Sequence, residues 1–154
     1  MTNNDILRRI RYIFDFSDDK MMAIFAAAGQ VVTREQISNW MKKEDDDAYK
    51  ACQDPQFARF LNGLINDKRG KKEGESSPVE KVLNNNIILR KLKIALDLKN
   101  EDVLELMQLA DFLMSKHELS AFFRKPGHKN YRECKDQILR NFLQGLQIKY
   151  RHDA

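Results

Sequence analysis

The chain has 154 residues, of which 42% are hydrophobic and 32% charged, and its formal net charge is +4. This balance is ordinary for a globular protein. No stretch is apolar for long enough to span a bilayer, and the N-terminus lacks the basic-then-apolar order of a signal peptide, so we expect no membrane insertion and a cytoplasmic location. In that reducing compartment a disulfide between the two cysteines, Cys52 and Cys134, is disfavoured, and we expect them as small buried residues.

The sequence matches itself, without a gap, at an offset of 82 residues. Residues 3–8 (NNDILR) align with residues 85–90 (NNIILR), and the match continues to Arg69 over Arg151. A repeat of this length predicts two similar units. We expect a first helical repeat at 1–70, a charged and apolar-poor linker at 71–82, and a second helical repeat at 83–154. Units this small rarely bury enough apolar surface alone, so we expect them to pack on each other.

The first two helices of each copy are predicted from apolar residues at helical spacing and from capping residues before them. Asn3 or Asn4 can cap the first helix. Ser17 can cap the second helix, and because Lys99 replaces it in the second copy, Asn100 is expected to take over as the cap there.

The third helix opens with a capping box in both copies. Thr33 precedes Gln36 by three residues, and Ser115 precedes Glu118 by the same spacing, which lets each pair satisfy two free N–H groups. The helix is expected to end in a basic pair, Lys42-Lys43 in the first copy and Arg124-Lys125 in the second.

The fourth helix is predicted to be capped by Asp54, with Pro55 at its first helical position, and by Asp136 in the second copy. Gly63 and Gly145 fall in the middle of this helix, where glycine costs about 1 kcal/mol relative to alanine. Because both copies keep the glycine, we expect a close helix crossing there. The eight helices predict an all-α fold of two tandem four-helix repeat units.

The best candidates for function are basic residues interleaved with an aromatic one, since phosphate attraction and base stacking would use both. They lie at the end of the third helix and in the following loop. In the second copy they are Arg124, Lys125, His128, Lys129, Tyr131 and Arg132, with weaker first-copy equivalents at Lys42, Lys43, Tyr49 and Lys50. A further candidate is the basic face of the first helix of the second copy, formed by Arg90, Lys91 and Lys93.

Charge differs between the two copies. Residues 1–82 hold 14 basic and 14 acidic residues, whereas residues 83–154 hold 13 and 9. The acidic run at 44–47 (EDDD) aligns with PGHK at 126–129. We therefore expect an anionic partner, either nucleic acid or an acidic protein surface, to bind mainly the second copy.

Catalytic signatures are missing from the sequence. There is no glycine-rich phosphate loop, nucleophile elbow or metal-ligand spacing, so we expect a non-catalytic binding module without cofactor. Two alternatives remain open. One is a protein-interaction or regulatory adaptor, and the other is a small enzyme with a site in the cleft between the repeats, around Tyr49, Tyr131 and His128.

The doubled pattern resembles a known family. Asn-Asn-x-Ile-Leu-Arg, an aromatic helix ending in a basic pair, Tyr-x-x-Cys-x-Asp and Phe-Leu-x-Gly-Leu are similar to the YehS family of bacterial proteins, and the resemblance runs from Asn3 to Arg151. The resemblance implies two tandem copies of a domain of unknown function in a soluble bacterial cytoplasmic protein. It implies no functional residues.

Overall fold

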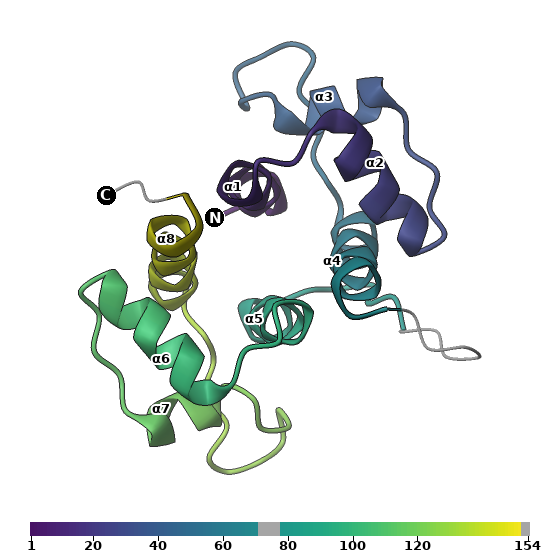
Figure 1. The fold of residues 1–154 in the computed structure, drawn as a ribbon. Coiled ribbons are helices and arrows are strands. Elements are labelled where there is room, and N and C mark those ends of the chain that lie inside the picture. The colour runs from purple at the N-terminus through teal and green to yellow at the C-terminus, as the bar shows by residue number, and fades with distance from the viewer. Residues whose placement is uncertain (71–77, 152–154) are drawn as a thin grey trace. The chain divides into compact units, whose positions relative to one another are not determined.

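The computed structural model describes residues 1–70 and 78–151 (Figure 1). This part of the chain forms eight helices and no strands, which confirms the all-α prediction. The helices are α1 (Asn3–Phe14), α2 (Asp18–Ala27), α3 (Arg34–Met41), α4 (Asp54–Arg69), α5 (Asn85–Ala95), α6 (Asn100–Leu109), α7 (Lys116–Ala121) and α8 (Asp136–Arg151).

The chain divides into two compact units, Met1–Leu83 with helices α1–α4 and Asn84–Ala154 with helices α5–α8. Most of the predicted linker, residues 71–77, lies outside the described residues.

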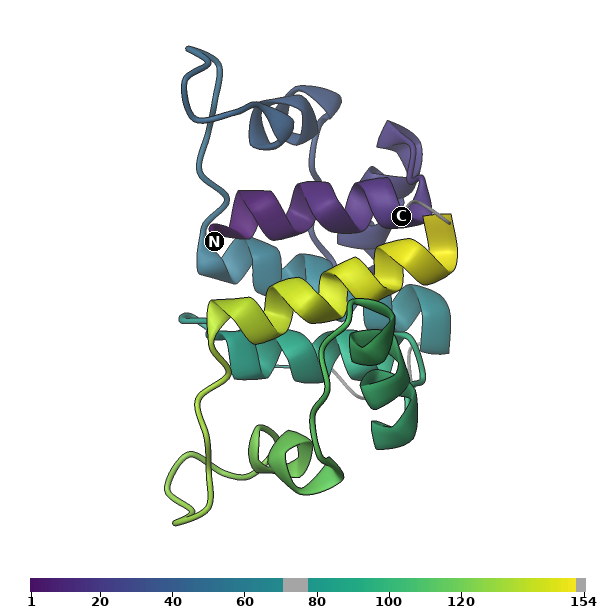
Figure 2. The same cartoon turned by 90° about the vertical axis from the view of Figure 1, so that its left-hand side faces the viewer.

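Most of the helix contacts of the first unit recur in the second. In the first unit α2 packs mainly on α4, and α3 and α1 complete the core; in the second unit α6 packs mainly on α8 in the same way. Aromatic rings fill the first core, where the ring of Phe25 lies 5.3 Å from those of Trp40 and Phe60. In both units the long loop before the last helix extends away from the packed helices (Figure 2).

A glycine in the last helix of each unit allows the main helix crossing. A Cβ atom on Gly63 would overlap the backbone carbonyl of Ile24, and one on Gly145 would overlap that of Leu106. Only glycine therefore permits α2 to approach α4, and α6 to approach α8, this closely. The predicted helix crossing is confirmed in both units.

A buried asparagine ties the first helix of each unit to the long loop. The Asn4 amide nitrogen donates to the carbonyls of Trp40, at 3.0 Å, and Lys50, at 2.8 Å, and its oxygen accepts from the Cys52 N–H at 2.9 Å. Asn86 makes the three equivalent bonds with Phe122, Arg132 and Cys134. All the polar atoms of the amide are thereby satisfied inside the protein.

Because Asn4 is used in this way, the prediction that Asn3 or Asn4 caps α1 is wrong. Thr2 is the N-cap, and its hydroxyl accepts from the Asp5 N–H. The Asn3 amide instead donates to the Asp54 carboxylate at 2.7 Å.

Two other predicted N-cap residues lie one position after the observed caps. Lys99, not Asn100, is the N-cap of α6, and the Asp102 carboxylate accepts from its N–H. Gln53, not Asp54, is the N-cap of α4. In both places the side chain three residues later supplies the acceptor, so the cap residue itself needs no short polar side chain.

The capping boxes at Thr33 and Ser115 are confirmed. However, α7 ends at Ala121, before the basic pair that was expected to close it.

Candidate anion-binding site in the second unit

The loop between α7 and α8 folds back onto the end of α7. The Arg132 N–H donates to the carbonyl of Ala121 at 3.2 Å, and a turn between them is closed by bonds from His128 to Lys125 and from Tyr131 to His128. The Asn86 amide, which accepts from the Cys134 N–H, holds the far end of the loop. These backbone bonds bring loop side chains against the first turn of α7.

A pocket of about 310 Å³ lies between this loop and α7. It is lined by His117, Glu118, Ala121, Arg124, Lys129, Asn130, Tyr131 and Arg132. Four of the six loop residues singled out in the sequence therefore line one pocket, namely Arg124, Lys129, Tyr131 and Arg132.

The remaining two loop candidates lie outside the pocket lining. Lys125 and His128 are exposed. The Nδ1 atom of His128 accepts from the Asn130 N–H at 3.0 Å, so this histidine shapes the turn. Arg124 also supports the loop, since its guanidinium donates to the Asn130 carbonyl at 3.2 Å.

The pocket is lined by three basic side chains and one carboxylate. The carboxylate is that of Glu118, whose pKa is lowered by hydrogen bonds from the side chain and backbone of Ser115 and by the charge of Arg132. An Arg132 guanidinium nitrogen lies 3.9 Å from a Glu118 oxygen, with both side chains more than half exposed. Because Glu118 is committed to the cap of α7 and only loosely paired with Arg132, the pocket keeps a positive excess.

The three basic side chains predicted to form a face on α5 do not share one exposed surface. Arg90 is exposed, but Lys91 is only 8% exposed, and the Lys93 ammonium lies 4.8 Å from the centre of the Phe123 ring. Lys91 therefore does not belong to an exposed basic face, because its side chain is buried.

The corresponding region of the first unit has a different charge. Positions equivalent to the pocket lining are occupied by Glu35, Gln36, Asn39, Lys42, Asp47, Ala48, Tyr49 and Lys50, so two acidic residues balance two basic ones. Partial burial and the carboxylate of Glu44 raise the pKa of Tyr49 above its ordinary value. Besides burial, the charge of Glu44 contributes to this shift, and a carboxylate beside the tyrosine opposes an anionic ligand.

His117 and Glu118 belong to the pocket but were not among the predicted site residues. They stand in the first turn of α7, and the loop reaches them because it is bonded back to α7 by the Arg132 N–H and to α5 by Asn86. The recurring capping box at Ser115 and Glu118 marked this turn in the sequence, but as a structural feature alone.

Among residues 1–70 and 78–151, no group of three or more histidine, cysteine or acidic side chains is arranged to hold a metal ion. None of the helices is long and apolar enough to cross a membrane. Cys52 and Cys134 are free and buried, and burial raises the pKa of each thiol to about 12.

Comparison with known proteins gives two matches. A family described as "Protein of unknown function (DUF1456)" matches residues 3–70 and again residues 85–152. The chain is also 46% identical to "Uncharacterized protein YehS" of Escherichia coli (strain K12), over 97% of this chain and 96% of that protein. These matches confirm the resemblance seen in the sequence motifs, and neither description names a reaction. No solved structure gives a significant match.

Proposed function

Since the chain belongs to the family described as "Protein of unknown function (DUF1456)", we propose a function from its own geometry: a non-catalytic module that binds an anionic partner through the pocket between α7 and the α7–α8 loop. The proposal rests on one observation. Arg124, Lys129, Tyr131 and Arg132 line a single pocket in the second unit.

The chemistry of this pocket favours single-stranded nucleic acid over an acidic protein surface. Guanidinium groups such as those of Arg124 and Arg132 can form paired hydrogen bonds with phosphate oxygens. Tyr131 adds an aromatic face on which a base can stack, and stacking contributes about 1–3 kcal/mol per base at such sites. An acidic protein would use the cations but would have no need of the tyrosine.

The proposal is tested by fluorescence anisotropy with a labelled single-stranded oligonucleotide over a salt series. Replacing Arg132 by alanine should weaken binding, and the slope of log K against log salt should fall by about 0.7 for each phosphate group that the variant no longer neutralises. Arg132 is preferred to Arg124 because Arg124 also bonds the loop backbone.

The matched control is Lys50→Ala, which removes the equivalent positive charge from the first unit. This variant should bind nearly as the unmodified protein does. If both variants lose affinity equally, net charge alone is responsible. If the unmodified protein does not bind oligonucleotide but captures an acidic protein after nuclease treatment, the partner is a protein.

One observation favours the adaptor alternative. Val31 and Leu113 occupy equivalent positions in the two units, and they are 91% and 80% exposed. Large apolar side chains exposed at the same turn in both copies could dock a protein partner. If they do, the double substitution Val31→Ser and Leu113→Ser should abolish capture of that partner and leave oligonucleotide binding unchanged.

A further inference from the structure

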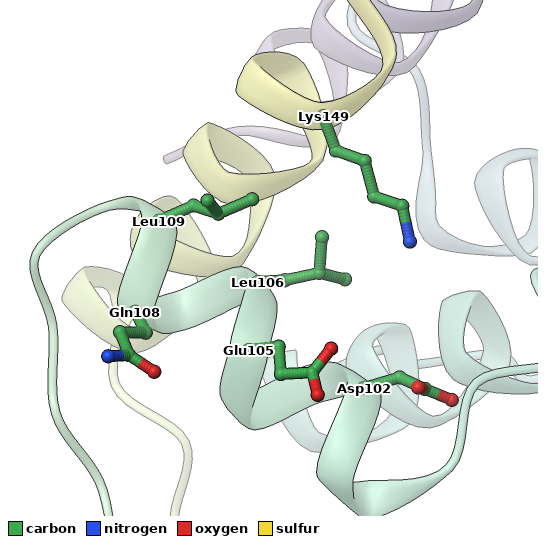
Figure 3. Close-up of a pocket in the computed structure, with 6 residues that line it drawn as sticks. All are labelled: Asp102, Glu105, Leu106, Gln108, Leu109 and Lys149. Atoms are coloured by element: carbon green, nitrogen blue, oxygen red, sulfur yellow. The ribbon is translucent and has the colours of Figure 1, made fainter.

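Another pocket, of about 460 Å³, lies between α6 and α8 of the second unit (Figure 3). It is lined by Asp102, Glu105, Leu106, Gln108, Leu109 and Lys149. Its volume is within the range of sites that hold small molecules. Leu106 is buried, whereas Leu109 is 46% exposed, so the pocket offers an apolar surface that solvent reaches.

Opposite charges reach this pocket from its two helices. Asp102 and Glu105 are three residues apart on α6 and therefore lie on the same side of that helix. Lys149 extends from α8 toward α6, so its ammonium and the Glu105 carboxylate approach the same opening (Figure 3). The pocket thus combines an anionic wall, a cationic wall and leucine side chains.

The first unit has the reverse arrangement at the same two positions. There Lys20 of α2 forms an ion pair with Asp67 of α4, with 2.9 Å between the ammonium nitrogen and the carboxylate oxygen. In the second unit the residues at these positions are Asp102 and Lys149. Among the described residues no ion pair joins these two, and the pocket lies between them.

A difference in helix crossing does not explain why Asp102 and Lys149 are unpaired with each other. The helices cross in the same way in both units, with Gly63 beside Ile24 and Gly145 beside Leu106. The first unit closes its charge pair. In the second unit no such pair forms among the described residues: Asp102 accepts from the Lys99 N–H, and the Lys149 ammonium lies 5.7 Å from the centre of the Tyr150 ring, so the two charges stay on opposite walls of the pocket. Separated charges on opposite walls favour a ligand that carries both charges itself.

We propose that the α6–α8 pocket binds a linear zwitterion, a molecule with an ammonium group at one end, a carboxylate at the other and an apolar chain between them. The ammonium group lies against Asp102 and Glu105, the carboxylate against Lys149, and the chain against Leu106 and Leu109. This site is separate from the basic pocket beside α7 and does not depend on the function proposed for it.

The test uses ω-amino acids of increasing length, from 4-aminobutanoate through 6-aminohexanoate to 8-aminooctanoate, with the full-length protein labelled for ¹H–¹⁵N NMR. Binding should shift the amide resonances of Glu105, Leu106 and Leu109, and one chain length should bind best. Hexylamine and hexanoate lack one charge each and should bind about fivefold more weakly than 6-aminohexanoate, because each forms one ion pair fewer.

Two variants make the test specific. Lys149→Met removes the cationic wall, and it should weaken 6-aminohexanoate binding but leave hexylamine binding no weaker. The triple variant Lys99→Ser, Asp102→Lys and Lys149→Asp copies the first unit, including the serine cap that replaces the Asp102 acceptor. The summed charge of positions 102 and 149 stays the same. The variant should fold, and it should not bind the zwitterion.

The proposal is overturned if none of the amino acids shifts the pocket resonances, or if hexylamine binds as tightly as 6-aminohexanoate. Equal binding by the triple variant would overturn it as well. Circular dichroism of each variant separates loss of the site from loss of the fold.

Discussion

Asn4 and Asn86 show how single side chains hold the long loops in place. Each is buried, and each satisfies two carbonyl groups and one N–H group on a segment more than 35 residues away in the chain. Neither of them caps a helix, although the sequence pattern predicts Asn3 or Asn4 as the cap of α1. Their bonds to the loop could not be predicted, because they depend on where the loop returns in three dimensions.

Replacing Asn4 by alanine should lower the free energy of unfolding by about 2–4 kcal/mol, because it leaves the Trp40 and Lys50 carbonyls and the Cys52 N–H without their partner. Urea unfolding followed by circular dichroism measures the change. Asn39→Ala serves as a control, since only the backbone of Asn39 bonds the loop, and it should cost less than about 0.5 kcal/mol. Equal effects of the two substitutions would contradict the role given to Asn4.

The thiols of Cys52 and Cys134 should be unreactive in the folded protein. Burial raises the pKa of each to about 12, so almost no thiolate is present at pH 8. Iodoacetamide should therefore label both only after unfolding. A raised folded pKa favours the neutral thiol, so stability from these groups is complete below about pH 8.5 and declines as the pH rises toward 12. Rapid labelling of the native protein at pH 8 would contradict this.

For the helices, the sequence predicted their positions along the chain better than it predicted their N-cap residues. Periodic apolar residues and repeated capping boxes indicated all eight helices. The N-cap residues of α1, α4 and α6 were predicted wrongly. At each of these helix starts, the cap is a residue other than the one with the strongest capping preference. Local preference decides a cap only when no other contact claims the side chain.

Alanine at Gly63 or Gly145 should destabilise the protein by about 2 kcal/mol or more, although alanine is the better helix former. The added Cβ would meet the backbone of Ile24 or Leu106, which cannot move without separating two helices. Thermal unfolding measures the loss.

Gly127→Ala is the matched control, because a Cβ there meets nothing within 4 Å. It should leave the melting temperature nearly unchanged. A stable Gly63→Ala variant would show that the helices can separate without cost.

At the scale of the whole molecule, the two units share a backbone plan but carry different charges. The offset of 82 residues predicted the shared plan, and the unequal charge led to the expectation that an anionic partner binds mainly the second unit. The loop residues that meet in that pocket were identified from composition. The contributions of His117 and Glu118 were not, because they depend on the return of the loop to α7. The burial of Lys91 could not be predicted either, because lysine side chains are usually exposed and only the three-dimensional packing shows the exception.

The most direct test of the anion-binding function uses two single variants at equivalent positions. Each gives one unit the residue of the other: Lys129→Asp in the second unit and Asp47→Lys in the first. The measurement is the affinity of each variant for a labelled single-stranded oligonucleotide at several salt concentrations. We expect Lys129→Asp to weaken binding and reduce the salt dependence, and Asp47→Lys to strengthen binding by removing a negative charge beside Tyr49 and Lys50. Unchanged affinity in Lys129→Asp, or salt-independent binding by the unmodified protein, would contradict the account.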